Sequence, residues 1–176
     1  KRYEGYCTDL ITEFALDWLQ KGRDPNKPFM LMCQHKAPHR NWTPAPRHLH
    51  LFDDVTLPEP PTLFDDYANR SRALAEQEMS IARNMSWGHD MKFHGTNQFP
   101  QYFAEGKNGE YDRMNDAQRA AWDAAYEPKN QAFLADLRAG KLDERGITRW
   151  KYQRYLKDYL RCIRAVDEGV GKVLDY

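Results

Sequence analysis

Four side chains that can carry a positive charge lie within six residues of the sequence: His35, Lys36, His39 and Arg40. Cationic donors at this density suit an anionic group, because each can donate a charge-assisted hydrogen bond to an oxyanion. Trp42 follows closely, and its indole offers a flat apolar surface on which a sugar ring can stack. Together these residues indicate a binding site for an anionic substrate that is linked to a sugar.

The segment before these residues is expected to position them. Residues 28–33 are almost all apolar, too few to span a membrane, and bounded by proline and polar residues, which predicts a buried strand. Ligands gather at the carboxyl ends of strands in open α/β sheets, and the cationic residues follow that end. Residues 8–21 carry a helical stripe, with Thr8 as the N-cap and Gly22 as the stop. The chain offers no second convincing strand, so we expect the sheet partners of residues 28–33 to lie outside it.

The rest of the sequence predicts helices and one long loop. Residues 35–65 hold six prolines, a density that fixes φ and removes amide donors, so no regular element is expected there. A long ordered loop of this kind is usually functional. Helical patterns follow at residues 66–81, 116–126, 129–139 and 148–174; Pro128 separates the second from the third, and Gly140 closes the third. The prediction is a helix-rich α/β piece with one strand.

Three motifs resemble the type I sulfatases. The pattern Ala37-Pro38-His39-x-x-Trp42-x-x-Ala45-Pro46 is similar to the block in which a Pro-His pair contacts the substrate sulfate, above all in N-acetylglucosamine-6-sulfatases and related bacterial glycosaminoglycan sulfatases. The block Gly5-Tyr6-Cys7-Thr8-Asp9 resembles the family's entry to this strand. The segment from Arg164 to Leu174 resembles the helix that precedes the family's second metal-binding loop. The middle, residues 67–148, matches only loosely.

This resemblance implies an alkaline-phosphatase-like α/β fold and the hydrolysis of 6-O-sulfate esters on N-acetylglucosamine-type sugars in glycosaminoglycan or mucin glycans. In the family, hydrated formylglycine attacks sulfur, a calcium ion neutralises sulfate charge, and Lys and His side chains hold the oxygens. By this carry-over His39 is the expected catalytic residue, and Lys36, His39, Arg40 and Trp42 are the expected substrate-binding residues. The family also implies a periplasmic or secreted parent protein.

Two family blocks are missing from the 176 residues. None of the three cysteines lies in the Cys/Ser-x-Pro/Ala-x-Arg motif that becomes formylglycine, and no Asp-Asn-Gly metal loop is present. Residues 1–176 are therefore expected to be the central part of a sulfatase catalytic domain. Such a piece would hold neither calcium nor formylglycine, would be inactive alone, and would need the missing parts of the parent domain as its partner.

Composition excludes some other classes of function. The 26 basic residues balance the 26 acidic ones, whereas a nucleic-acid-binding surface would need a basic excess or stripe. No stretch is long and apolar enough to span a membrane. The three cysteines fit no zinc spacing and are interpreted as small buried hydrophobic residues.

Several residues keep a second interpretation. His35 and His39 have the spacing of a zinc pair on a helix, but Pro38 argues against a helix there. Lys36 and Arg40 could bind a second anionic group or be solvated, and Trp42 could pack under the proline-rich loop.

Clusters elsewhere in the sequence are also open. The acidic pairs Asp53-Asp54 and Asp65-Asp66 could bind metal, but ordinary loop and capping roles are preferred, and no metal ligand is assigned. The cluster His89-Asp90-x-Lys92-x-His94 could reach a substrate. A phosphodiesterase or phosphonate hydrolase of the same superfamily, and a non-catalytic glycan-binding module, are the alternative functions.

Overall fold

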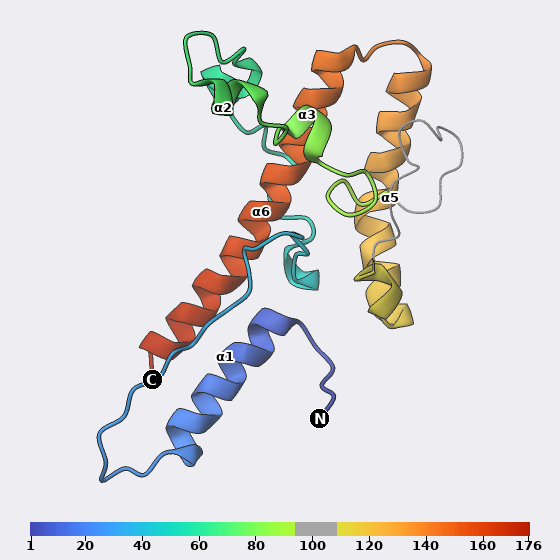
Figure 1. Cartoon of the computed structure of the whole chain (residues 1–176). Coiled ribbons are helices and arrows are strands. Elements are labelled where there is room, and N and C mark those ends of the chain that lie inside the picture. Colours follow the sequence, from blue (N-terminus) through green and yellow to red (C-terminus); the bar gives the residue numbers. More distant parts are fainter. Residues whose placement is uncertain (94–108) are drawn as a thin grey trace. The chain divides into compact units, whose positions relative to one another are not determined.

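The computed structural model describes residues 1–93 and 109–176, and all regular elements in those ranges are helices (Figure 1). The chain divides into two compact units. Unit 1 comprises residues 1–51 and 158–176, and unit 2 comprises residues 52–157. Helix α6 (Glu144–Leu174) belongs to unit 2 in its first part and to unit 1 in its last part. Unit 1 is therefore assembled from the two ends of the sequence.

The helices follow the chain from α1 at the N-terminus to α6. The α-helices are α1 (Cys7–Asp17), α2 (Arg72–Glu76), α3 (Ile81–Asn84), α5 (Asp116–Arg138) and α6. The short π- or 3-10 segments are η1 (Trp18–Gly22), η2 (Pro46–His48), η3 (Pro61–Phe64) and η4 (Tyr111–Arg113). The expectation that residues 35–65 hold no regular element is wrong at η2 and η3. Each begins with a proline, whose fixed φ suits the first position of a helical turn.

Helix α1 confirms the helix predicted near the N-terminus, with different ends. The expected N-cap, Thr8, lies inside the helix and is buried, while Tyr6 occupies the cap position. The helix continues through the π-helical turn η1 to Gly22, where the predicted stop lies. The buried side chains of this stretch are Thr8, Thr12, Ala15 and Leu19.

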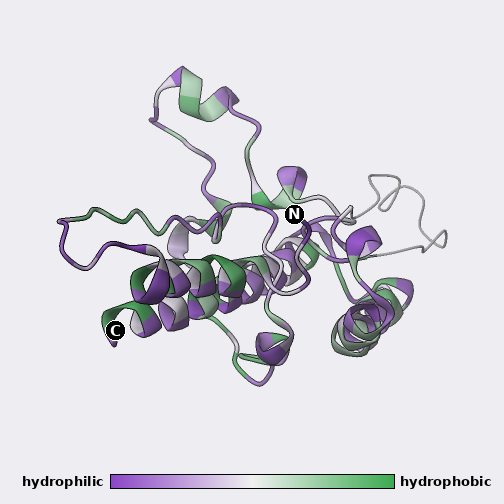
Figure 2. Ribbon diagram, turned by 90° about the horizontal axis from the view of Figure 1, so that it is seen from below, coloured by the Kyte–Doolittle hydropathy of each residue, from purple (hydrophilic) through white to green (hydrophobic). Residues whose placement is uncertain are grey.

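The predicted buried strand at residues 28–33 is absent. The segment pairs with no strand in the described ranges, and Phe29, Met30 and Met32 are 52%, 80% and 68% exposed. In Figure 2 it is a green stretch of chain without regular structure. A strand needs neighbouring strands to satisfy its backbone donors and acceptors. The apolar composition of residues 28–33 predicted that the segment would be buried in a sheet, but the described part of the chain provides no strand to pair with it.

Helix α5 runs unbroken through Pro128, so the predicted division into two helices is wrong. Asn115 caps it with a capping box in which its side chain accepts from the Gln118 amide and the Gln118 side chain accepts from the Asn115 amide. The buried residues on both sides of the proline form one stripe: Trp122, Ala125, Tyr126, Asn130, Phe133 and Leu134. Packing of this continuous face holds the helix together across the missing amide. Gly140, with φ of 67°, follows the helix end as predicted.

The helix expected at residues 66–81 forms only in part. The pieces that do form are α2 and α3, capped by the side chains of Ser71 and Ser80. Helix α6 instead begins earlier than predicted, because the Asp143 carboxylate accepts a hydrogen bond from the Gly146 amide and caps the first turn.

Unit 2 has an aromatic core between α5, α6 and the residues that follow α3. Trp87 packs against Phe93, Phe133 and Trp150 with ring centroids 5.4–6.3 Å apart. Met91 and Leu134 complete the buried cluster. The Lys151 ammonium lies 4.5 Å from the Trp87 ring and donates to the carbonyls of Ala82 and Met85.

All three cysteines are free, but they are not all buried. Cys162 is buried, Cys33 is half-buried and Cys7 is exposed at the start of α1, so the buried interpretation is wrong for Cys7. Within the described residues, no helix is both long and apolar enough to cross a membrane.

Candidate functional site

The predicted catalytic residue, His39, lies on an exposed turn of unit 1. The His39 amide donates to the Lys36 carbonyl at 2.9 Å, which closes the turn. The peptide bonds before Pro38 and after Arg40 are cis. Lys36, His39 and Arg40 are all exposed, so the structure brings the three predicted cationic residues to one surface turn.

The His39 ring has a defined tautomer. Its Nδ1 lies 2.5 Å from the Arg40 carbonyl oxygen, which can only accept, so Nδ1 carries a proton and donates it. Nε2 is then the ring nitrogen left to face a ligand. An imidazole held in this way can hold an anion through Nε2–H and transfer that proton to a leaving oxygen.

Trp42 packs against the turn and bonds to it. Its side chain is buried, its Nε1 donates to the Pro38 carbonyl at 2.9 Å, and its ring packs edge-on against the Tyr159 ring. This is the packing alternative raised for this residue; stacking of Trp42 on a sugar stays a prediction.

His35 is tied to helix α1. Its Nε2 lies 2.9 Å from the Thr12 hydroxyl, which donates its own proton to the Thr8 carbonyl. The hydroxyl can therefore only accept from His35, so Nε2 of His35 carries a proton and is not available to a zinc ion. The segment that leads to His39 is thus anchored to α1 just before the turn.

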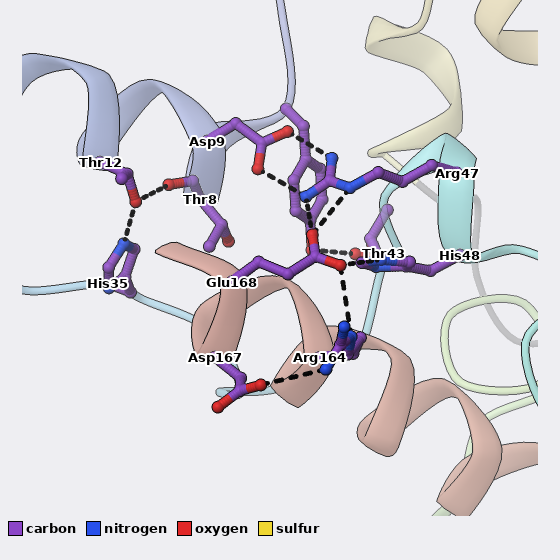
Figure 3. Close-up of polar contacts among 11 residues, drawn as sticks. Thr8, Asp9, Thr12, His35, Thr43, Arg47, His48, Arg164, Asp167 and Glu168 are labelled. Carbon is purple, nitrogen blue, oxygen red and sulfur yellow. Dashed lines mark hydrogen bonds and ion pairs between the residues drawn. The ribbon is translucent and has the colours of Figure 1, made fainter. Parts of the chain in front are cut away.

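Just after the turn, Arg47 joins two helices (Figure 3). Its Nη1 and Nη2 donate to the two carboxylate oxygens of Asp9 on α1 at 2.6 and 2.9 Å. Its Nε and Nη2 donate to Oε2 of Glu168 on α6 at 2.9 and 2.8 Å. Oε1 of Glu168 lies 2.9 Å from His48 Nε2 and 3.3 Å from Arg164 Nε. Two acidic groups and three basic groups thus form one ion-pair cluster.

The cluster shifts the pKa of Glu168 and of Arg47. Burial raises the pKa of the Glu168 carboxyl, but hydrogen bonds from Arg47 and His48 outweigh it, so the pKa lies below its ordinary value. The hydrogen bond to Asp9 raises the pKa of Arg47. Both shifts favour the charged forms, the Glu168 carboxylate and the Arg47 guanidinium.

Tyr6 adds a third connection. Its phenol donates to the Thr43 carbonyl at 2.9 Å. Burial raises the pKa of the phenol most, and the charge of Cys162 raises it further. The phenol is therefore a permanent donor that ties the N-terminus of α1 to the segment after His39.

The three sequence motifs therefore meet in unit 1, but the residues that join them were not predicted. Asp9 and Glu168 lie within the two flanking motifs without having been assigned a role, and Arg47 lies just past the central one. The only available signal was the presence of opposite charges in separate motifs, which does not identify the pairs.

The remaining candidates lie in unit 2. Asp53 pairs with Lys129 at 2.6 Å, while Asp65 and Asp66 accept from backbone amides two residues further along the chain, at Tyr67 and Ala68. Within residues 1–93 and 109–176, no group of three or more His, Cys, Asp or Glu side chains could hold a metal ion. The described acidic side chains thus do not fit a calcium site.

The cluster around Asp90 is largely internal. Asp90 and Lys92 are fully buried; Asp90 accepts from the amide and hydroxyl of Ser86, and the Lys92 ammonium donates to the Asp90 carbonyl. His89 is half-buried, and His94 lies outside the described residues.

Comparison with known protein families gives one match that covers the whole chain: the Sulfatase family, over residues 1–176. The chain belongs to the sulfatase family. This confirms the resemblance stated on the three motifs, together with the alkaline-phosphatase-like fold that it implied.

Individual relatives agree. The sulfatase chain is 42% identical over 173 residues to an N-acetylglucosamine-6-O-sulfatase of Bacteroides thetaiotaomicron, a match that covers 98% of this chain and 30% of the relative. It is 35% identical over 63 residues to an arylsulfatase of Clostridium perfringens, covering 36% of this chain and 12% of the relative.

A solved structure is also similar. A protein in complex with its substrate D-glucosamine-2-N,6-O-disulfate superposes with a TM-score of 0.85 and 41% identity, over 99% of this chain and 34% of that chain. The match thus spans about a third of the length of the N-acetylglucosamine-6-O-sulfatase and of the solved structure.

Proposed function

We propose that the protein to which these residues belong is a sulfuric ester hydrolase that removes 6-O-sulfate from N-acetylglucosamine-type sugars of glycosaminoglycans or mucins. The observation that carries this proposal is the exposed turn that holds Lys36, His39 and Arg40, with the His39 ring bonded through Nδ1 to the Arg40 carbonyl. The 42% identity to an N-acetylglucosamine-6-O-sulfatase supports the choice of substrate class.

The chemistry assigned to this chain is binding and proton transfer. His39, protonated at Nε2, would donate to a sulfate oxygen and then to the leaving sugar oxygen as the S–O bond breaks. Lys36 and Arg40 would attract the anion, and Trp42 would contact the sugar. Formylglycine and calcium, which would supply the nucleophile and neutralise sulfate charge, are assigned to parts of the protein outside these 176 residues. The acidic groups described here do not fit the metal, so the isolated chain is expected to be inactive.

The proposed location follows from the substrate. Sulfated glycosaminoglycans and mucins are extracellular polymers, so we assign the whole protein to the periplasm or to the secreted fraction.

The test is hydrolysis of 6-sulfated N-acetylglucosamine by the full-length protein and its His39→Ala variant. Removal of a transition-state donor is expected to lower kcat by about a hundredfold or more. His50→Ala is the matched control, since His50 is also exposed in unit 1, and its kcat should stay within about twofold of the wild-type value. Circular dichroism and thermal unfolding would confirm that all three proteins are folded.

Other outcomes would redirect the proposal. An active wild type with an equally active His39→Ala variant would move the sulfate contact to another residue. If the wild type cleaves phosphodiesters or phosphonates but no sulfate ester, the protein is instead a phosphodiesterase or phosphonate hydrolase of the same superfamily. Glycan binding without any hydrolysis would favour a binding module.

A further inference from the structure

The segment that carries His39 has little structure of its own. Residues 35–48 contain only the turn closed at Lys36 and the short η2, so few backbone hydrogen bonds fix its path. Its position depends instead on contacts with α1 and α6. His35 bonds to Thr12, the Thr43 carbonyl accepts from Tyr6, and Arg47 bonds to Asp9 and Glu168.

Arg47 differs from the other two contacts because it bonds to both helices at once. Its planar guanidinium presents one edge to Asp9 and another to Glu168, an arrangement that a single ammonium group cannot reproduce. The Asp9 and Glu168 side chains are 25% and 27% exposed, so water competes only partly for these bonds. Arg47 therefore fixes η2 relative to both helices.

The residues between η2 and the turn are tightly packed, so the position of η2 affects the position of the turn. Ala45 is completely buried, Trp42 is largely buried, and the Trp42 indole bonds to the Pro38 carbonyl next to His39. Side chains packed in this way cannot adjust independently, because close-packed interiors transmit small displacements. A shift of η2 would therefore move the His39 ring.

His48, the residue after Arg47, also bonds to Glu168. His48 is buried, its Nε2 donates to Glu168, and its Nδ1 has no hydrogen-bond partner among the residues that the structure describes. Since Nδ1 gains nothing in the present position, the hydrogen bond to Glu168 is what orients the ring. Arg47 and His48, adjacent in sequence, thus depend on the same carboxylate.

We propose that Arg47, held by Asp9 and Glu168, is a positioning residue for His39. It does not touch the substrate, but it keeps the His39 ring in the orientation in which Nε2 can donate to the substrate. This inference rests on the proposed function for its catalytic consequence. The structural part, that Arg47 fixes residues 35–48, does not depend on it.

The experiment compares full-length wild type with Arg47→Ala, Arg47→Lys, Glu168→Gln and the double variant Arg47→Ala/Glu168→Gln. The catalytic readouts are kcat and KM on 6-sulfated N-acetylglucosamine. The structural readout is hydrogen exchange of peptides that cover residues 35–48, with peptides from α1 as the internal reference. Arg149→Ala is the matched control, because Arg149 also pairs with a loop carboxylate, Glu59, at a similar side-chain exposure of 47%.

For Arg47→Ala we expect kcat to fall by about 10- to 100-fold, the scale of an ångström-sized misplacement. KM should change by less than about threefold, since the lost interaction acts mainly in the transition state. Arg47→Lys should recover part of kcat. The double variant should lower kcat by less than the product of the two single effects, because the Arg47–Glu168 interaction is lost in both single variants. Exchange in residues 35–48 should rise while α1 stays protected.

Each contrary result is distinct. Unchanged kcat and unchanged exchange in Arg47→Ala would overturn the inference while leaving the proposed function intact. A parallel rise of exchange in α1 and in residues 35–48, with a lowered unfolding temperature, would overturn it in favour of a general stabilising role. If the wild type hydrolyses no sulfate ester, the proposed function fails, and faster exchange confined to residues 35–48 would still support the structural part.

Discussion

Gly169 on α6 has only a hydrogen atom where the other types of amino acid carry a Cβ, and the Thr12 hydroxyl occupies the adjacent space. A Cβ built there would overlap the Thr12 hydroxyl and would lie 3.5 Å from His35 Nε2. Thr12 is 1% exposed and hydrogen-bonded on both sides, so it cannot easily move away. The close approach of α6 to α1, and with it the anchoring of His35, therefore requires glycine at this position.

We predict that Gly169→Ala destabilises the full-length protein by about 1–2 kcal/mol, because overpacking outweighs the gain of about 0.5–1 kcal/mol in helix propensity. Gly171→Ala is the control two residues along the same helix, where a Cβ would have no atom of the described residues within 4 Å. It should be neutral or slightly stabilising. Urea unfolding measures both.

The same prediction has an internal check. In a Thr12→Ala background the hydroxyl is gone, so Gly169→Ala should cost much less than it does alone. An equal cost in the two backgrounds would show that the clash with Thr12 is not the cause.

At the scale of elements, helix α5 shows packing overriding a local signal. Pro128 cannot donate to the Ala124 carbonyl, and its ring crowds that oxygen, a combination that costs about 3 kcal/mol in a helix interior. The helix nevertheless continues, because Tyr126 and Asn130 on either side of the proline are both buried on one face. Pro128 itself is exposed, so its ring contributes little packing in return.

Pro128→Ala is therefore expected to stabilise the protein by about 1–3 kcal/mol, since it restores the hydrogen bond and relieves the clash. Pro128→Gly should gain about 1 kcal/mol less, because glycine restores the amide but favours the unfolded chain. Thermal unfolding of the two variants and the wild type measures the order. A Pro128→Ala variant no more stable than the wild type would show that the rest of unit 2 is adapted to a bend at this residue.

The elements also show what could be predicted from the sequence. The apolar stripes at residues 8–21 and 148–174 predicted α1 and most of α6, because a helix stripe is a local property. The strand at residues 28–33 was wrong, because a strand depends on neighbours that the described part of the chain does not provide. The family motifs predicted a catalytic role for His39, which stays a prediction. They did not reveal that Arg47 joins Asp9 to Glu168, since no local pattern connects residues so far apart.

At the scale of the whole molecule, the chain covers 30% of the Bacteroides enzyme, and it exposes an apolar segment. Met30 and Met32, at alternate positions of residues 28–33, are 80% and 68% exposed. An extended apolar segment with unpaired backbone groups is a template for pairing with another chain.

We predict that the isolated 176-residue chain self-associates through residues 28–33 in a concentration-dependent manner. Met30→Lys/Met32→Lys should shift sedimentation toward the monomer, because the charges oppose pairing on one face of the segment. Leu174→Lys is the control, since Leu174 is an equally exposed apolar residue, 79%, at the end of α6. Association that survives the double substitution would place the contact elsewhere, and circular dichroism would verify that the helices are retained.

The assembly of unit 1 from both ends of the sequence also has a consequence during synthesis. Arg47 and Glu168 are 121 residues apart. At about 5–20 residues per second, Glu168 leaves the ribosome roughly 6–24 s after Arg47. During that interval Arg47 can meet Asp9 but not Glu168, while the whole of unit 2 emerges and can fold. The turn that carries His39 is thus among the first parts of this chain to be translated and among the last to be fixed in place.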